Sequence, residues 1–166
     1  MPDRASIIAT QQPKQQNIWD LYIPGITGLN GKEETLMLSL RNMPLPKSTT
    51  AVITVPMDGT EAKFAGKTTF QDLSVTFNDW FDKDTAHLIK EWRRLAYDPD
   101  TGGSGLVSAY KKDGYMKVYT SEEEFVATYN LDGAWLSSDD FGTVDKGSGE
   151  VIQISCTLTI DRGYLV

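Results

Sequence analysis

The sequence has few of the residues from which enzymes most often build active sites. Its 166 residues include one histidine, His87, and one cysteine, Cys156. One cysteine cannot form an intrachain disulfide, and one histidine with one distant cysteine cannot make a zinc site. His87 falls in a predicted helix and Cys156 on the apolar face of a predicted strand, so neither indicates a nucleophile with its base. We therefore predict a protein that is not an enzyme and has no catalytic, metal-binding or cofactor-binding residues.

Long apolar runs and excess positive charge are also missing. No stretch approaches the roughly 20 apolar residues of a membrane span, and residues 1–16 lack the basic flank and apolar run of a secretion signal. We expect a soluble protein without a membrane anchor. The formal net charge of −7 argues against tight binding of DNA, although a like-charged wall suits DNA that slides past without sticking.

Three patterns resemble functional motifs but favour ordinary structure. The segment 98–103 resembles a calcium loop, yet it contains Pro99 and lacks the later bidentate glutamate, so a turn is expected. Asp139 and Asp140 are adjacent, which indicates a solvated turn and not a carboxylate pair across a cleft. The tryptophans could suggest sugar stacking, but their spacing predicts core packing for at least three of the four, which are Trp19, Trp80, Trp92 and Trp135.

Alternation of apolar and polar residues is the strongest pattern present. In the segment 150–161, apolar residues alternate with polar residues that are mostly serine and threonine, and the segment 69–77 repeats this order with Leu73, Val75 and Phe77. The apolar positions of the first segment are Ile152, Ile154, Cys156, Leu158 and Ile160. A period of two predicts strands with one buried face and one hydroxyl-rich face.

Other segments predict further strands and one helix. Strands are expected over 18–23, 35–41, 114–119 and 124–135, with the first two paired as a hairpin. A helix over 79–97, capped by Asn78 or Asp79, would bury a stripe that includes Phe81, Leu88, Trp92 and Leu95. One helix among six or seven strands predicts a mainly β fold, a β-sandwich or squashed barrel of two packed antiparallel sheets with one flanking helix.

One domain over residues 18–166 is expected, preceded by an arm over 1–17. The excursion over 42–66 is long for a compact domain and carries a predicted exposed hairpin, which favours a functional role. Its apolar residues indicate a partner surface, unless they fold back onto their own core; they are Val52, Ile53, Val55 and Met57.

The order and spacing of these segments resemble the tail tube protein of contractile-tailed bacteriophages. The resemblance covers residues 18–161 and rests on the strand 19–23, the long loop from Asn42, the segment 69–77 running into a helix, the segment 131–135 and the closing segment 150–161. It implies hexameric rings stacked into a tube in the virion tail, assembled in the host bacterial cytoplasm, with sheath, baseplate, tape-measure and tail terminator proteins as partners. DNA would pass through without specific binding.

By the same resemblance, the loop over 42–66 would stack one ring on the next. The polar strand faces are candidates for the lumen or the outer wall, and their residues are Asp72, Ser74, Thr76, Ser155, Thr157 and Thr159. Within this architecture, the inner tube of a type VI secretion system or of a phage-tail-like bacteriocin is an alternative. A monomeric carbohydrate-binding β-sandwich module is a more distant one.

Overall fold

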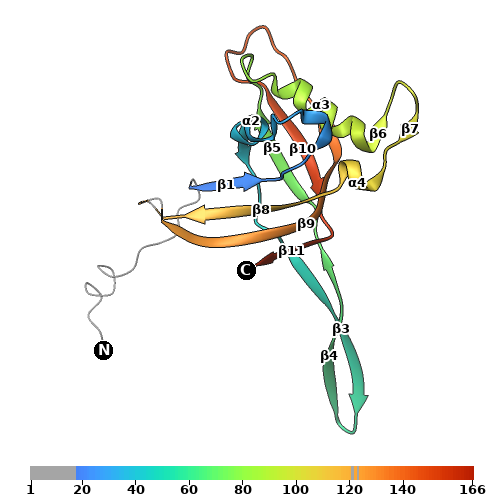
Figure 1. Cartoon of the computed structure of the whole chain (residues 1–166). Helices are drawn as coiled ribbons and strands as arrows, with labels where there is room; N and C mark the ends of the chain where they lie inside the picture. Colours follow the sequence, from blue (N-terminus) through green and yellow to red (C-terminus); the bar gives the residue numbers. More distant parts are fainter. Residues whose placement is uncertain (1–17, 121, 123) are drawn as a thin grey trace, which may run out of the picture.

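The computed structural model describes residues 18–120, 122 and 124–166, so the predicted N-terminal arm over 1–17 lies outside the described residues. The fold is built on a seven-stranded antiparallel sheet (Figure 1). Its strand order is β1 (Trp19–Tyr22), β8 (Lys112–Tyr119), β9 (Phe125–Asp140), β10 (Gln153–Thr159), β5 (Leu73–Asn78) and β2 (Leu40–Asn42), and β11 (Arg162–Leu165) also pairs with β9.

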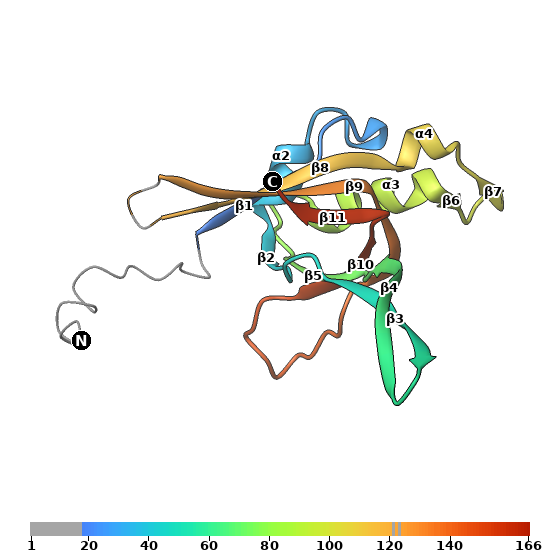
Figure 2. The ribbon, with the colours of Figure 1, turned by 90° about the horizontal axis from the view of Figure 1, so that it is seen from below.

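Strand β9 belongs to two half-sheets because it bends in its middle. Its residues 125–134 pair with β8 and its residues 129–132 with β11, whereas residues 135–140 pair with β10. The bend falls at Gly133, whose φ of 65° lies in the left-handed region that favours glycine. We call β1, β8, β11 and the first part of β9 half-sheet A, and β2, β5, β10 and the last part of β9 half-sheet B. Figure 2 shows the two half-sheets facing each other across the body.

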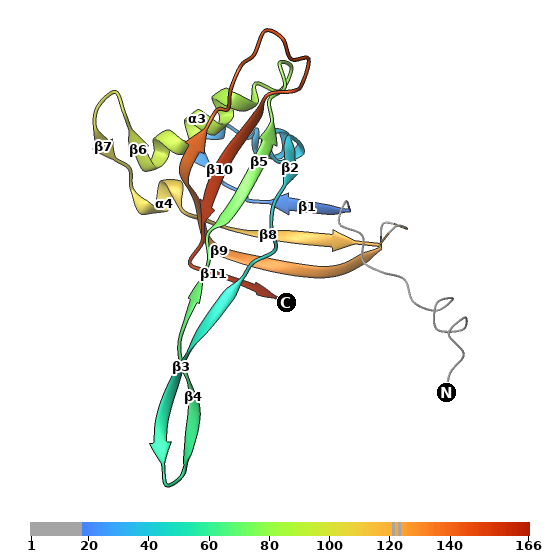
Figure 3. The same cartoon turned by 180° about the vertical axis from the view of Figure 1, so that it is seen from behind.

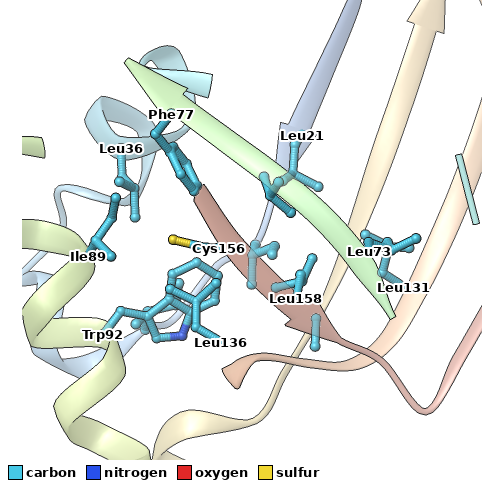
Figure 4. Packing of buried hydrophobic residues seen from close by; sticks show 14 of the residues in the cluster. Leu21, Leu36, Leu73, Phe77, Ile89, Trp92, Leu131, Leu136, Cys156 and Leu158 are labelled. Carbon is cyan, nitrogen blue, oxygen red and sulfur yellow. The ribbon is translucent and has the colours of Figure 1, made fainter. Parts of the chain in front are cut away.

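The core fills the space between the half-sheets (Figure 4). The inward positions of β5 pair with those of β10, so that Phe77 lies opposite Ile154 and Val75 opposite Cys156. All four side chains are buried, as is Leu131 of β9. The predicted β-sandwich is confirmed, and so are the predicted inward faces of both strands except at Ile152, which precedes β10 and is exposed.

Helix α3 (Thr85–Ala96) covers the core with Leu88, Ile89 and Trp92, which confirms most of the predicted stripe. The predicted start is wrong, because the helix begins six residues later than expected, with Asp84 as its N-cap residue. Phe81 was predicted on the buried stripe but lies in the preceding turn and is fully exposed. The remaining helical segments are η1 (Thr27–Leu29), α2 (Glu33–Leu38) and α4 (Val107–Tyr110), and none of the described helices could span a membrane.

The predicted strand over 35–41 is also wrong. Residues 33–38 form α2, which buries Leu36 and leaves Leu38 65% exposed. Leucine, methionine and glutamate favour a helix. The hydroxyls of Ser39 and Thr85, both buried, then lie 3.0 Å apart and connect the end of α2 to the start of α3. The hairpin predicted with β1 does not form, since β1 pairs with β8 and β2 pairs with β5.

Some strand boundaries differ from the predictions, and one strand was not predicted. The segment 69–77 is divided, because β4 (Thr60–Phe70) ends before Gln71 and β5 begins at Leu73. Strand β9 continues to Asp140, so Asp139 and Asp140 lie in a strand and not in a turn. The short strand β11 was not predicted. A two-residue pair of strands, β6 (Tyr97–Asp98) and β7 (Gly103–Ser104), encloses the predicted turn after α3.

The bend in β9 generates a prediction about stability. In Gly133→Ala, the left-handed backbone should cost about 1–2 kcal/mol, and the new methyl group would displace the ion pair between Lys111 Nζ and Asp161 Oδ2, which are 2.6 Å apart. Urea unfolding should therefore show a lowered midpoint. Gly149→Ala is the matched control, because an added Cβ there meets no neighbouring atom within 4 Å. Equal midpoints for the two variants would contradict this account of the bend.

Candidate assembly surfaces

Strands β3 (Ser48–Met57) and β4 form a hairpin that stands away from the body (Figures 1 and 3). Every residue of β3 is exposed. Met57 pairs with Thr60 across the turn Asp58-Gly59, where Gly59 adopts a φ of 75°. The predicted exposed hairpin is confirmed, and its apolar residues do not fold back onto the core of the same chain.

The hairpin has one apolar face and one mixed face. Cross-strand partners share a face, and successive residues of a strand alternate between faces. Ile53 pairs with Phe64 and Val55 with Ala62, so these four and Met57 share one face, which we call the apolar hairpin face. The opposite face carries Val52, Thr54, Pro56, Glu61 and Lys63.

This register refines the set predicted from sequence. Val52 points to the other face of the hairpin from Ile53, Val55 and Met57. It therefore cannot contact the same flat partner surface. Phe64, which is 53% exposed, was missed. Its place follows from counting the pairs back from the Asp58-Gly59 turn, so the sequence did contain a signal for it.

The outward face of half-sheet B collects most of the predicted polar candidates. Thr76 pairs with Ser155, which pairs with Asp140, and in the next row Ser74, Thr157 and Ser138 lie side by side. The Thr159 hydroxyl donates a hydrogen bond to Ser137 Oγ at 2.8 Å. Asp72 lies apart from these rows, in the connection between β4 and β5. Asn78 and Gln153 extend the face, Trp135 shares it as the partner of Thr159, and the edge strand β2 adds Asn42 beside the exposed Arg41. Its central strand positions therefore carry mainly hydroxyls and amides, with one carboxylate and one indole.

The outward face of half-sheet A is chemically different. Tyr22 stacks near Tyr115 with ring centroids 5.3 Å apart, and the Lys117 ammonium lies 5.2 Å from the Tyr115 ring. Arg162 and Asp132 form an ion pair at 2.7 Å. Tyrosine and arginine are enriched at protein interfaces and at the residues that contribute most to binding.

The patterns that resemble catalytic motifs have structural roles. Arg94 Nη2 lies 3.0 Å from Asp98 Oδ1 and 2.9 Å from Asp100 Oδ2, across the turn after α3. The Asp100 backbone N–H, and then Arg94, lower the pKa of Asp98. Asp139 pairs with Arg93 of α3 at 3.2 Å. Within the described ranges, no three His, Cys, Asp or Glu side chains are grouped as metal ligands.

Tryptophan exposure bears on the carbohydrate-binding alternative. Trp92 is buried and Trp19 and Trp135 are partly buried, as the spacing predicted, whereas Trp80 is 40% exposed. A glycan-binding platform needs several exposed aromatic rings on one surface, and these four rings do not form one.

Comparison with solved structures reveals a common fold. The chain is similar to a chain of the cap of the anti-feeding prophage, described as its tube-terminating cap, with a TM-score of 0.72 and 17% identity over 100% of this chain and 99% of that one. It is similar to a chain of the sheath–tube complex of an extracellular contractile injection system, with a TM-score of 0.70 and 16% identity over 99% and 98%. A type six secretion system protein matches with a TM-score of 0.50 and 11% identity over 89% and 81%.

These likenesses establish the class of fold. The chain has the tail tube fold found in contractile injection assemblies, and the fold implied by the resemblance of its sequence is confirmed. No protein-family model and no curated protein sequence matches the chain.

Cys156 generates a prediction about chemical reactivity. Burial, and then the nearby Asp139 carboxylate, raise the pKa of this thiol from 9.0 to about 12. Because the thiolate is the reactive form, alkylation at pH 8 should be slower in the folded protein than in urea by about a thousandfold or more. Ser155→Cys, on the outward face next in sequence, should react rapidly in the folded protein. Rapid labelling of Cys156 itself would contradict its placement in the core.

Proposed function

We propose that this chain is the tube subunit of a contractile tail or contractile injection device. It assembles into hexameric rings, and the rings stack into a tube. One observation carries the proposal: a tail tube fold bears a detached hairpin with an apolar face that its own chain leaves uncovered. Sheath, baseplate, tape-measure and terminator proteins are the partners that such a tube requires.

The hairpin needs a partner for physical reasons. A two-stranded ribbon alone in water is marginally stable. Met57, Ile53 and Phe64 are each more than half exposed in the single chain. Burying such residues contributes about 25 cal/mol per Å² of apolar surface, so contact with a neighbouring subunit would both cover and order the hairpin.

The outward face of half-sheet B is the better candidate for the lumen. A channel wall should not hold its cargo, and this face presents mainly hydroxyls and amides with one carboxylate, while the exposed Arg41 lies in β2 at the edge of the half-sheet. The aromatic and charged face of half-sheet A suits contacts with surrounding proteins instead. Four strands of half-sheet B from each of six subunits would give a ring of 24 strands.

The dimensions of such a ring fit a channel for a polymer. Strands about 4.8 Å apart and tilted about 40° would close at a backbone diameter of about 48 Å. Side chains of about 5 to 8 Å on each wall would leave about 32 to 38 Å. A DNA duplex about 20 Å across would pass through this channel.

Two cargoes suit this wall. In a bacteriophage tail, the tube would carry DNA from the virion into the host. In an extracellular injection device, in a type VI secretion system or in a phage-tail-like bacteriocin, it would carry protein or nothing. The likeness to chains of the anti-feeding prophage and of an extracellular contractile injection system favours the second reading. The genes beside this one would separate the two.

Replacing one residue of the apolar hairpin face should separate stacking from ring formation. Ile53→Asp places a charge at the centre of that face and should leave single rings where the unaltered chain forms tubes in negative-stain electron microscopy. Thr54→Asp is the matched control, because Thr54 is exposed on the opposite face and should still stack. Normal tubes from Ile53→Asp would contradict the stacking role of the hairpin. If the unaltered chain showed only monomers at high concentration, the proposed tube function would be wrong.

The lumen assignment can be tested by labelling assembled tubes. Ser155→Cys should react with a small maleimide but not with a maleimide coupled to a carrier protein wider than the channel. Lys117→Cys, on the outward face of half-sheet A, should react with both reagents. The buried Cys156 contributes little background. Equal reaction of Ser155→Cys with the two reagents would place half-sheet B on the outside.

A further inference from the structure

We propose that the end of the subunit opposite the hairpin is the surface that receives the apolar hairpin face of a second copy of this chain. We call it the cap surface. Its exposed apolar residues are Trp80, Phe81, Phe141, Val144, Val151 and Ile152. This inference rests on the proposed tube function and names the partner of the hairpin.

The cap surface is made by two loops that lie against each other. One is the turn over 79–84 between β5 and α3, and the other is the connection over 141–152 between β9 and β10. The Asp79 backbone N–H donates a hydrogen bond to the Ile152 carbonyl at 2.9 Å and joins them. Phe81 is fully exposed and Val144 is 79% exposed. Several apolar side chains gathered on two adjacent loops are typical of an interaction site.

The cap surface and the hairpin lie at opposite ends of half-sheet B. Strand β5 follows the hairpin at its Leu73 end and leads into the turn over 79–84 after Asn78, while β10 begins at the same end with Gln153. Figures 1 and 3 both show the hairpin at one end of the molecule and the connection between β9 and β10 at the other. Two different surfaces at opposite ends make a heterologous contact, which continues from copy to copy without closing.

Charge favours contact of the cap with a hairpin over contact of two caps. The two cap loops carry Asp79, Asp82, Asp84, Asp145 and Glu150 against Lys83 and Lys146. Two caps would therefore repel each other. Strand β3 carries no charge, and the hairpin as a whole is neutral, because Lys63 and Lys67 balance Asp58 and Glu61. A neutral hairpin therefore approaches the acidic cap without the repulsion that two caps would meet.

The test uses one variant in each of the two surfaces, which lie at opposite ends of the subunit. Phe81→Asp disables the cap and Ile53→Asp disables the hairpin, and both positions are exposed, so circular dichroism and thermal unfolding should match those of the unaltered protein. Each variant alone should give single rings. Purified rings of the two variants mixed in equal amounts should give ring pairs and nothing longer, because one junction can form between an intact hairpin and an intact cap. Mass photometry and negative-stain microscopy would count the particles.

Leu106→Asp is the matched control, since Leu106 is 77% exposed and belongs to neither surface. It should form tubes of normal length. Normal tubes from Phe81→Asp would overturn the cap assignment and leave the tube function standing. Single rings throughout the mixture would show that the hairpin docks elsewhere. Growth of the unaltered chain that stops at ring pairs would show hairpins meeting hairpins. Absence of rings from the unaltered chain would overturn the proposed function and the cap together.

Discussion

The bend of β9 at Gly133 is the constraint on which the rest of the structure depends. One strand of 16 residues supplies both half-sheets, so the core between them closes without a separate connection. The left-handed backbone at this position is easily adopted by glycine, and the space around it is taken by the Lys111–Asp161 ion pair. Strand β10 pairs with the last part of β9, and β11 pairs with the first part. The bend therefore also sets the direction of half-sheet B, and with it the directions of the hairpin and the cap loops.

The same division separates two kinds of surface. Half-sheet A presents aromatic rings, ion pairs and a cation over a ring, whereas half-sheet B presents rows of hydroxyls and amides. In the proposed tube, the first set of groups would bind neighbouring proteins and the second would line the channel, since a face of hydroxyls and amides offers few strong binding wells. The outward faces of one continuous sheet would then have different tasks.

Sequence pattern predicted the parts of the fold that repeat over many residues. The period of two correctly predicted the buried faces of β5 and β10. The prolines that flank the apolar run within residues 42–66 correctly predicted the exposed hairpin. Short segments failed, because Leu36, Leu38 and Leu40 fit a strand as well as a helix, and the choice depended on contact with α3. Phe81 fitted a helical stripe, but the helix starts after it. The cap surface could not be predicted, because its two loops are 57 residues or more apart in sequence and meet through β5 and β10.

In the proposed tube, a single junction between two subunits would be weak. The net charge of −7 makes subunits repel each other. One apolar hairpin face is small, and its contact alone would barely offset that repulsion and the loss of freedom on association. The proposed ring of six copies would present six hairpins in one fixed geometry, so that once the first had docked the others would meet their partners at high effective concentration. Stacking would then be strong between rings and negligible between single subunits, and ring formation would be the step that commits the subunits to a tube.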